Sequence, residues 1–290
     1  MGIRKNWKVW SLFSLLCLIW GSSFYLIKLG LEAYSPIQVA VVRLGCTLPF
    51  VAPFALKFLR QLSRTSLGYV IVVGLLSTLI PSFLFALAQT KVNSATAGIL
   101  NATVPIFTVV IGYLGFRKTI NRVTFLAIVI GLFAVGTIIL KRSDETLSIN
   151  QLAIFILLAT FGYGLNINTV KAKLKEIDAF AIAMVSVFFS GLLVLPLLIL
   201  DWQSYRLDTQ AHDLKPLWAL LTLGILGTAL AQYLQNAIIK LTDTEFASSV
   251  TYVIPIVAVF WGLLDGEEVN LTTIVAGICI LLCVYLIRRG

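Results

Sequence analysis

About ten apolar stretches, each close to 20 residues long, follow one another along the chain and leave only short polar connections between them. A helix rises about 1.5 Å per residue, so about 20 apolar residues are needed to cross the roughly 30 Å hydrocarbon layer of a bilayer. The expected spans are Val9–Leu29, Pro36–Leu56, Leu67–Ala88, Ser94–Leu114, Val123–Leu140, Gln151–Val170, Asp178–Leu200, Pro216–Ile239, Phe246–Leu264 and Leu271–Ile287. The sequence therefore predicts an all-α polytopic membrane protein with ten transmembrane helices.

The composition excludes several other classes. Hydrophobic residues make up 59% of the 290 residues, charged residues only 12%, and the mean hydropathy is +0.97. Soluble domains carry roughly a quarter charged residues, so a water-soluble globular domain is excluded, and so is a disordered chain. The formal net charge of +9 does not indicate nucleic acid as a partner, because the basic residues are scattered between the apolar runs. The expected partners are a lipid bilayer and a small-molecule substrate, and the oligomeric state is left open.

Two segments have a second interpretation. The first apolar run follows a short basic segment, as in a signal peptide, but its only small-residue cleavage candidate, Gly21-Ser22-Ser23, lies in the middle of the run. We therefore expect this run to remain as a helix. The longest polar stretch, residues 201–215, is too short to form a domain and is expected to be a connecting loop, with a lid as the alternative.

The distribution of Lys and Arg predicts the orientation. With the N-terminus inside, the cytoplasmic segments contain 15 Lys and Arg residues and the opposite segments contain six. Cytoplasmic loops retain an excess of positive residues. We therefore expect a multi-pass protein of the cytoplasmic (inner) membrane with both termini in the cytoplasm.

An internal repeat divides the chain into two halves, residues 1–145 and 146–290. Matches at an offset of 143 include Trp20-Gly21 with Tyr163-Gly164, Lys28 with Lys171, and Pro53 with Pro196; matches at 150 include Gly74 with Gly224, Thr78 with Thr228, Pro105 with Pro255, and Gly112 with Gly262; Gly131 matches Gly277 at 146. Five spans per half is an odd number, so the second half is predicted to be inverted. Inverted repeats are a common architecture of secondary transporters, whose substrate site lies near mid-membrane between the repeats.

The residues in these repeats resemble the EamA-like ten-helix permeases of the drug/metabolite transporter superfamily over nearly the whole chain. The similar segments are residues 18–24 (LIWGSSF), 42–44 (VRL), 97–107 (AGILNATVPIF), 247–256 (ASSVTYVIPI), Gly266-Glu267 and Gly277. The resemblance implies movement of small metabolites, often amino acids, and commonly outward. The family usually has a Gly-Glu-like pair after both the fourth and the ninth helix. The first copy here reads Gly115-Phe116-Arg117-Lys118 and contains no acid, so the resemblance supports a role for that position only at Glu267.

Arg43 is the only ionisable residue well inside a predicted span. A charge at such a depth costs roughly 2.5–3.5 kcal/mol on insertion scales unless it finds a partner or reaches the interface. Arg43 is expected either to reach the outer interface and bind backbone carbonyls, or to anchor a substrate carboxylate or a neighbouring helix.

A neutral set of polar and aromatic side chains provides the candidate substrate site. Polar residues in a span face a cavity or another helix, and both functions stay open for each of them. Together with Arg43, the candidates are Trp20, Ser23, Tyr25, Phe83, Asn101, Tyr163, Asn166, Gln232, Gln235, Asn236, Tyr252 and Trp261. Amide and hydroxyl groups beside aromatic walls suit a zwitterionic or uncharged polar solute.

Prolines within the spans and charged residues at the ends of the spans bear on how a transporter could change conformation. Pro105 and Pro255 occupy matching positions within spans, where proline removes a backbone hydrogen bond, and they are either hinges or ordinary kinks. Lys28 and Lys171 are expected to mark membrane interfaces, and the acidic group that includes Glu267 is expected to be a solvated loop. No carboxylate or histidine lies deep in a span, so exchange, or coupling through Glu267 at the edge, is as well supported as proton antiport.

The sequence contains no pattern typical of an enzyme, a cofactor site or a metal site. Cys279 and Cys283 share a helix face, but no acidic residue lies near them and His212 lies in a distant polar loop, so we expect packed thiols and no metal. There is no nucleophile-base pair or phosphate-binding loop. The function predicted is secondary transport by alternating access that exports a small neutral or zwitterionic metabolite; the alternative is a non-transporting scaffold or sensor.

Overall fold

The fold is taken from a computed structural model, which describes residues 7–143, 146–149, 151–200 and 214–289. Each of the ten expected spans coincides with one helix or with consecutive helical pieces. In chain order these are α1 (Trp7–Leu31); α2 (Pro36–Gly45) and α3 (Leu48–Leu59); α4 (Arg64–Gly74), a π-helical turn (Leu75–Leu79) and α5 (Ile80–Ala88); α6 (Ser94–Asn101) and α7 (Val104–Phe116); α8 (Arg122–Ile139); α9 (Ala153–Lys173); α10 (Ala179–Leu200); α11 (Lys215–Gly224), a second π-helical turn (Ile225–Leu230) and α12 (Ala231–Leu241); α13 (Thr244–Ser248), a 3₁₀ turn (Ser249–Tyr252) and α14 (Ile254–Leu264); and α15 (Leu271–Arg289).

Most of the expected spans are long and apolar enough to cross a membrane. Among the described residues, seven segments are long and apolar enough to cross a membrane, and α2 with α3 forms an eighth that is bent by 53°. In α8 and α15, which have 18 and 19 residues, the stretches whose side chains are described are residues 122–138 and 271–283, and both are apolar. The protein is therefore a helical polytopic membrane protein, and the number of ten crossings stays a prediction.

A short β-hairpin departs from the all-α expectation. Strand β1 (Leu140–Ser143) pairs antiparallel with β2 (Thr146–Ile149), with Leu140 opposite Ile149. It directly follows α8 and joins the two halves of the chain. The sequence predicts only a short polar connection here.

Side-chain caps set the starts of several helices. At α2, the Ser35 hydroxyl accepts a hydrogen bond from the backbone N–H of Gln38, and the Gln38 side chain accepts one from the N–H of Ser35. The side chains of Asn93 and Asp243 also accept hydrogen bonds from backbone N–H groups, at the starts of α6 and α13, without the reciprocal bond. These oxygens satisfy backbone donors that have no partner within the first helical turn.

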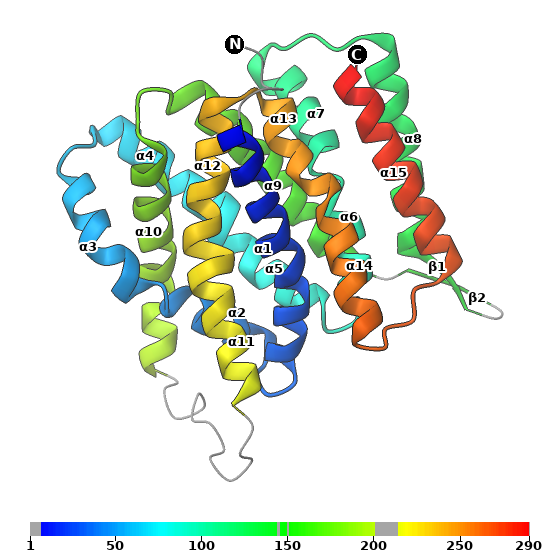
Figure 1. Cartoon of the computed structure of the whole chain (residues 1–290), viewed down its shortest axis with the longest axis horizontal. Helices are drawn as coiled ribbons and strands as arrows, with labels where there is room; N and C mark the ends of the chain where they lie inside the picture. The colour runs from blue at the N-terminus through cyan, green and yellow to red at the C-terminus, as the bar shows by residue number, and fades with distance from the viewer. Residues whose placement is uncertain (1–6, 144–145, 150, 201–213, 290) are drawn as a thin grey trace.

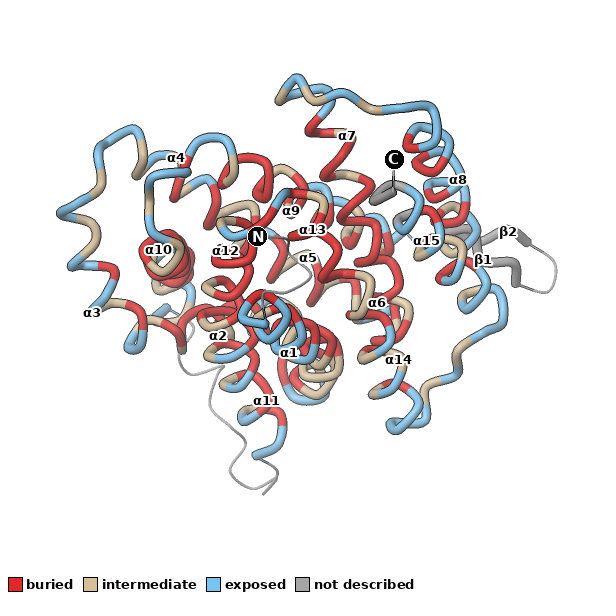
Figure 2. The backbone as a smooth tube through the Cα atoms, turned by 45° about the horizontal axis from the view of Figure 1, so that its top comes forward, coloured by how far each residue is buried: buried red, intermediate tan, exposed pale blue. Residues whose placement is uncertain are grey.

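The helices surround a buried centre. α1 packs against α11, α12 and α14, while α9 packs against α5 and α7; α8 and α15 lie side by side at one edge (Figure 1). Buried backbone concentrates where α1, α5, α6 and α9 meet, and exposed residues cover the outer turns (Figure 2). The start of α1, the end of α15 and the α7–α8, α9–α10 and α12–α13 connections all lie at one end of the bundle, which we call the α7–α8 end (top in Figure 1).

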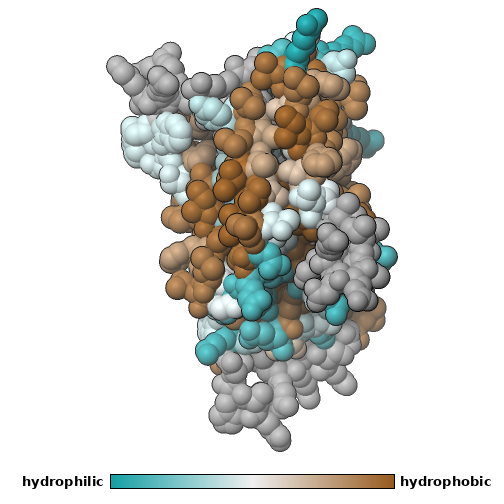
Figure 3. Space-filling view, turned by 90° about the vertical axis from the view of Figure 1, so that its right-hand side faces the viewer, coloured by the Kyte–Doolittle hydropathy of each residue, from teal (hydrophilic) through white to brown (hydrophobic). Residues whose placement is uncertain are grey.

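Large apolar side chains cover the outside of the bundle. On the face formed by α8 and α15, Phe133 is 77% exposed, Phe125 56% and Ile278 53%. Brown apolar atoms form a band between hydrophilic ends on this face (Figure 3). An exposed apolar surface of this extent is unfavourable in water and suits contact with lipid.

Candidate functional site

A polar cavity lies at the centre of the bundle. The volume of this cavity is about 40 Å³, enough for roughly three water molecules. The lining residues are Trp20, Ser23, Phe24, Ile27, Arg43, Ser77, Phe85, Asn101, Val104, Tyr163, Asn166, Ile167, Gln232, Gln235 and Thr251. They come from α1, α2, α5, α6, α7, α9 and α12, from the first π-helical turn and from the 3₁₀ turn, so both halves of the chain contribute.

Most of the sequence-predicted candidates line this cavity. Those that do so are Trp20, Ser23, Arg43, Asn101, Tyr163, Asn166, Gln232 and Gln235; those outside the lining are Tyr25, Phe83, Asn236, Tyr252 and Trp261. Ser77, Phe85 and Thr251 also line the cavity but are not among the sequence-predicted candidates. The repeat could have pointed to Ser77, because it lies one residue before Thr78, which matches Thr228.

The candidates outside the lining pack elsewhere. The rings of Tyr25 and Trp261 stack on each other with centroids 5.2 Å apart, and Trp261 Nε1 donates to Ser22 Oγ at 2.9 Å. Asn236 is completely buried. Phe83 packs against a cluster of apolar side chains that includes Leu44.

Arg43 lies on α2 and lines the cavity. Its Nε donates a hydrogen bond to Thr228 Oγ1 at 2.8 Å. Among the described residues, no carboxylate lies within 4.0 Å of its guanidinium, since the ion pairs there involve only Lys28 and Lys118. Thr228 lies in the second π-helical turn, a distortion frequently found at functional sites. Arg43 therefore contacts a neighbouring helix, as one sequence interpretation expected, and keeps an unneutralised charge at the cavity.

Amide groups form much of the remaining polar lining. Gln232 is held in place because its Nε2 donates to the Ser77 carbonyl oxygen at 2.9 Å. By contrast, Asn101 Oδ1, Asn166 Oδ1 and Gln235 Oε1 are buried and have no hydrogen-bond partner in the described structure. A buried acceptor without a partner costs about 1–3 kcal/mol, so these three oxygens need a donor from a bound molecule or water.

Aromatic rings form an apolar wall. Tyr163 stacks on Trp20 with centroids 6.3 Å apart, and on Phe85 with centroids 6.2 Å apart. Trp20 is held by a hydrogen bond from its Nε1 to the Gly227 carbonyl oxygen at 3.2 Å. This wall offers apolar contact beside the polar groups.

An ionic cluster closes the end of the bundle opposite the α7–α8 end. Lys28 pairs with Asp265 and, at 3.0 Å, with Glu267. The Glu267 carboxylate also accepts hydrogen bonds from the backbone N–H groups of Ser94 (3.2 Å) and Ala95 (3.1 Å) at the start of α6. Its side chain is only 4% exposed, so the expectation of a solvated acidic loop is wrong for this residue.

The surroundings of Glu267 also shift the pKa of its carboxyl group. Burial raises the pKa of its carboxyl group, but the hydrogen bonds from Ala95, Lys28 and Ser94 outweigh burial, so the pKa lies below its ordinary value. The ionised carboxylate is the form that holds α14, α6 and α1 together here.

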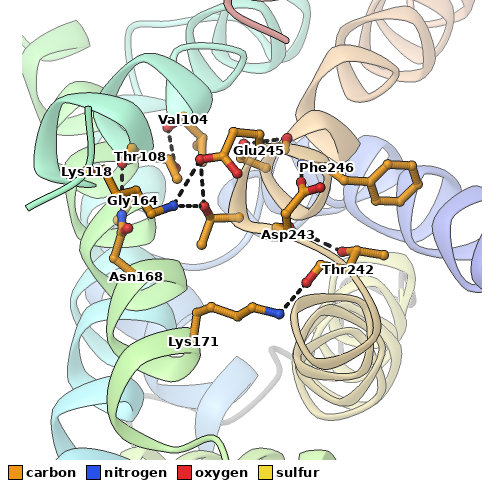
Figure 4. Close-up of polar contacts among 12 residues, drawn as sticks. Val104, Thr108, Lys118, Gly164, Asn168, Lys171, Thr242, Asp243, Glu245 and Phe246 are labelled. Atoms are coloured by element: carbon orange, nitrogen blue, oxygen red, sulfur yellow. Dashed lines mark hydrogen bonds and ion pairs between the residues drawn. The ribbon is translucent and has the colours of Figure 1, made fainter. Parts of the chain in front are cut away.

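A second ionic cluster lies at the α7–α8 end (Figure 4). Lys118 Nζ pairs with Glu245 Oε1 at 2.9 Å and donates to the hydroxyl of Thr244, both at the start of α13. Beside it, Lys171 donates to the carbonyl oxygens of Thr242 and Ile239. Lys171 was expected to mark an interface, and the structure adds that it binds the end of α12.

The helical breaks fall at matching places. Ala102 and Thr103 separate α6 from α7, and Pro105 is among the first residues of α7. Val253 separates the 3₁₀ turn from α14, and Pro255 is among the first residues of α14. Proline is tolerated there because its missing N–H would have no helical partner. Among the described residues, no group of three or more His, Cys, Asp or Glu side chains is arranged to hold a metal; His212 lies outside them.

Comparison with known families supplies the class of the protein. The model of the EamA-like transporter family matches residues 7–140 and again residues 151–289. The chain belongs to the EamA-like transporter family. It is thus a multi-pass membrane transporter whose environment is a lipid bilayer and whose substrate is a small molecule.

Relatives of this EamA-family chain are named as transporters. It is 24% identical over 272 residues to "Uncharacterized transporter YoaV" of Bacillus subtilis, covering 92% of this chain and 91% of that protein. It is 28% identical over 289 residues to "Uncharacterized inner membrane transporter YedA" of Escherichia coli strain K12, covering 95% and 89%. A solved crystal structure shares the fold with a TM-score of 0.65 at 15% identity, over 97% of this chain and 98% of that one.

Proposed function

We propose that this transporter exports a small neutral or zwitterionic, amino-acid-like metabolite by alternating access between two inverted five-helix repeats, residues 1–145 and 146–290. The observation that carries this proposal is the central cavity, which both halves line with buried amides, one arginine and stacked aromatic rings. Convergent polar groups beside an apolar wall are typical of small-molecule sites. The double match of the family model to residues 7–140 and 151–289 supports the two repeats.

Close backbone contacts support the inverted arrangement. A Cβ added to Gly74 would lie 2.5 Å from the carbonyl oxygen of Ser186, and one added to Gly224 would lie 2.5 Å from that of Arg43. Gly74 and Gly224 are 150 residues apart, and Arg43 and Ser186 are 143 apart, which are the two offsets of the repeat. The same contact thus occurs twice with the halves exchanged, as a pseudo-two-fold axis requires.

The distortions within helices follow the same relation. The π-helical turns Leu75–Leu79 and Ile225–Leu230 begin 150 residues apart, and so do the helices α6 and α13 that precede the breaks near Pro105 and Pro255. Broken helices around a central site are typical of secondary transporters. We propose hinges at Pro105 and Pro255 for this reason.

Alternating access needs a closure at each end that opens separately. The Lys28–Glu267 cluster and the Lys118–Glu245 cluster lie at opposite ends of the α6–α7 and α13–α14 segments. Both clusters are formed in this structure, which fits a state in which both ends are closed. Opening one cluster while the other stays closed would expose the cavity to one side of the membrane.

We also propose a cytoplasmic-membrane location with the α7–α8 end inside. That end brings together Arg117, Lys118, Lys171, Lys173 and Lys240 with the start of α1 and the end of α15. An excess of positive residues marks the cytoplasmic side. The description of YedA as an inner membrane transporter supports this location.

Counterflow in proteoliposomes tests the transport proposal. Vesicles preloaded with one unlabelled L-amino acid would accumulate the same amino acid in labelled form, and uptake would saturate. Protein-free vesicles provide the control. If saturable counterflow is absent for the twenty L-amino acids and for uncharged polar metabolites alike, the proposal is wrong, and the alternative of a scaffold or sensor gains support.

A further inference from the structure

We propose that the central cavity recognises a zwitterion at two separate groups of side chains: Arg43 binds the substrate carboxylate, and the amide oxygens of Asn101, Asn166 and Gln235 bind its ammonium group. This inference rests on the proposed transport function and assigns the substrate class more narrowly, to free α-amino acids in preference to uncharged, anionic or cationic solutes.

The carboxylate position follows from the unneutralised charge of Arg43. Its Nε is occupied by Thr228, so the hydrogen bond fixes one edge of the guanidinium, and the terminal nitrogens have no partner among the described residues. A buried cation is strongly unfavourable without an anion. The planar guanidinium fork matches a carboxylate with two parallel hydrogen bonds. A substrate carboxylate therefore supplies the missing counter-charge.

The ammonium position follows from the three orphaned oxygens. Asn101, Asn166 and Gln235 are 4%, 2% and 3% exposed, and the side-chain oxygen of each is without a donor. An ammonium group carries three N–H donors and no acceptor, as a lysine ammonium does. One such group offers a donor for each of the three oxygens, whereas an acetylated amine offers a single donor and adds an acceptor beside them.

The two groups of side chains come from different parts of the bundle. Arg43 lies on α2, which packs against α5, α10 and α11. Asn101 ends α6 and Asn166 lies on α9, and these two helices pack against each other. Gln235 Nε2 donates to Ala247 of α13, which also packs against α9. Arg43 therefore reaches the cavity from α2, whereas the three orphaned oxygens reach it from α6, α9 and α12, and the aromatic wall is available for an apolar side chain.

The second repeat has no charged residue at the position that matches Arg43. The residue that matches Arg43 at the offset of 143 is Ser186, which is completely buried, is absent from the cavity lining and donates to the Ala183 carbonyl oxygen. Among the described residues, the three orphaned oxygens would therefore share the cavity with only one cationic group, and a bound amino acid would have one orientation. Ser186 also provides a matched control position.

Competition in the counterflow assay tests both assignments. Full-length protein in proteoliposomes would exchange a labelled equimolar mixture of neutral L-amino acids, with three competitors: the same amino acids unlabelled, their methyl esters and their N-acetyl derivatives. We expect the esters and the N-acetyl derivatives each to compete at least about tenfold more weakly than the free amino acids, since one lost charge-assisted hydrogen bond is worth about 1.5–3 kcal/mol and 1.4 kcal/mol is tenfold.

Variants separate substrate recognition from folding, because the measured quantity is the ratio between the competing strengths of two compounds. Arg43→Gln should abolish the preference for free amino acids over methyl esters, and Arg43→Lys should restore part of it. Asn166→Leu should abolish the preference over N-acetyl derivatives, and Ser186→Ala should leave both ratios unchanged. If a variant does not fold, the competition ratios of the wild-type protein still test both assignments.

Equal competition by esters would overturn the carboxylate assignment, and equal competition by N-acetyl derivatives would overturn the ammonium assignment. Saturable flux of an uncharged metabolite without amino acid flux would overturn the inference while leaving the transport function intact. No saturable flux of any candidate would overturn the transport proposal itself.

Discussion

Gly74 lies directly against the backbone of Ser186, so that a Cβ at Gly74 would stand only 2.5 Å from the Ser186 carbonyl oxygen. The matched contact between Gly224 and Arg43 has the same distance. In both places α4 or α11 approaches the backbone of the facing helix, and at Gly224 the side chain of Cys46 also lies against the Cβ position. These contacts set how closely the two halves pack around the cavity.

Gly74→Ala should therefore destabilise the protein although alanine favours helices. Overpacking typically costs about 1–3 kcal/mol, and backbone cannot move aside as a flexible side chain does. Gly136 on α8 is the matched control, because a Cβ there meets nothing within 4 Å; Gly136→Ala should be neutral or stabilising by up to about 1 kcal/mol. Thermal unfolding in detergent measures both, and equal effects would show that the close contact is not important.

Glu267 should make stability depend on pH. Its folded pKa lies below the ordinary value, so its contribution is fully present above the unfolded pKa of about 4.3 and is lost as the pH falls through the lower folded pKa. Glu267→Gln should lower the unfolding temperature at neutral pH and flatten its decline below about pH 4. Glu268→Gln is the control, because that neighbouring side chain is exposed. A similar decline in the Glu267→Gln variant would contradict the prediction.

The Lys118–Glu245 pair should tolerate exchange of its charges. Ser94 and Ala95, which bind Glu267 at one end, match Thr244 and Glu245 at the offset of 150. At the Lys118 end the arrangement of charges is reversed. The carboxylate of Glu245 lies at the start of α13, and the ammonium group of Lys118 follows the end of α7. Lys118→Glu or Glu245→Lys alone should slow transport by opening this end, and the double exchange should recover most of the rate.

Stability should respond only weakly to the same substitutions. Both side chains are more than a third exposed, so solvent screening limits the pair to about 0.2–1 kcal/mol. Transport rate and unfolding temperature are therefore measured together. A double variant that transports no better than the single variants would argue against a closure by this pair.

The breaks at Pro105 and Pro255 should matter for rate more than for binding. Alanine restores a backbone N–H at each position and allows the adjoining helical pieces to become continuous, which would stiffen a hinge. We expect Pro105→Ala and Pro255→Ala to reduce the maximal counterflow rate while half-saturation changes little. Pro81→Ala, near the start of α5, is the comparison. Unchanged rates in both hinge variants would refute the hinge proposal.

Thr228 should act by positioning Arg43. Thr228→Val removes the acceptor of the 2.8 Å bond from Arg43 Nε, which frees the guanidinium to rotate and leaves a donor unpaired. We expect half-saturation to rise several-fold, with a weaker preference for free carboxylates over esters. Thr78→Val changes the matching residue in the first π-helical turn, where no arginine is bound, and should leave this preference unchanged.

The sequence by itself determined the membrane class and the positions of the helices. In a bilayer every backbone polar group needs an internal partner, so a run of about 20 apolar residues has one stable form, the helix, whatever lies beside it. The repeat offsets were likewise visible in residues such as Gly74 and Gly224. Neither feature depends on how the side chains of distant helices meet.

Tertiary structure alone decided which polar residues meet at the cavity. Asn166 and Asn168 are two positions apart, but helix geometry points them to different sides: Asn166 lines the cavity, whereas Asn168 donates to the carbonyl oxygens of Thr108 and Gly164. The burial of Glu267 and the π-helical turn that places Thr228 beside Arg43 also need partners far along the chain. Such contacts follow from the packing of the two halves, which no local pattern specifies.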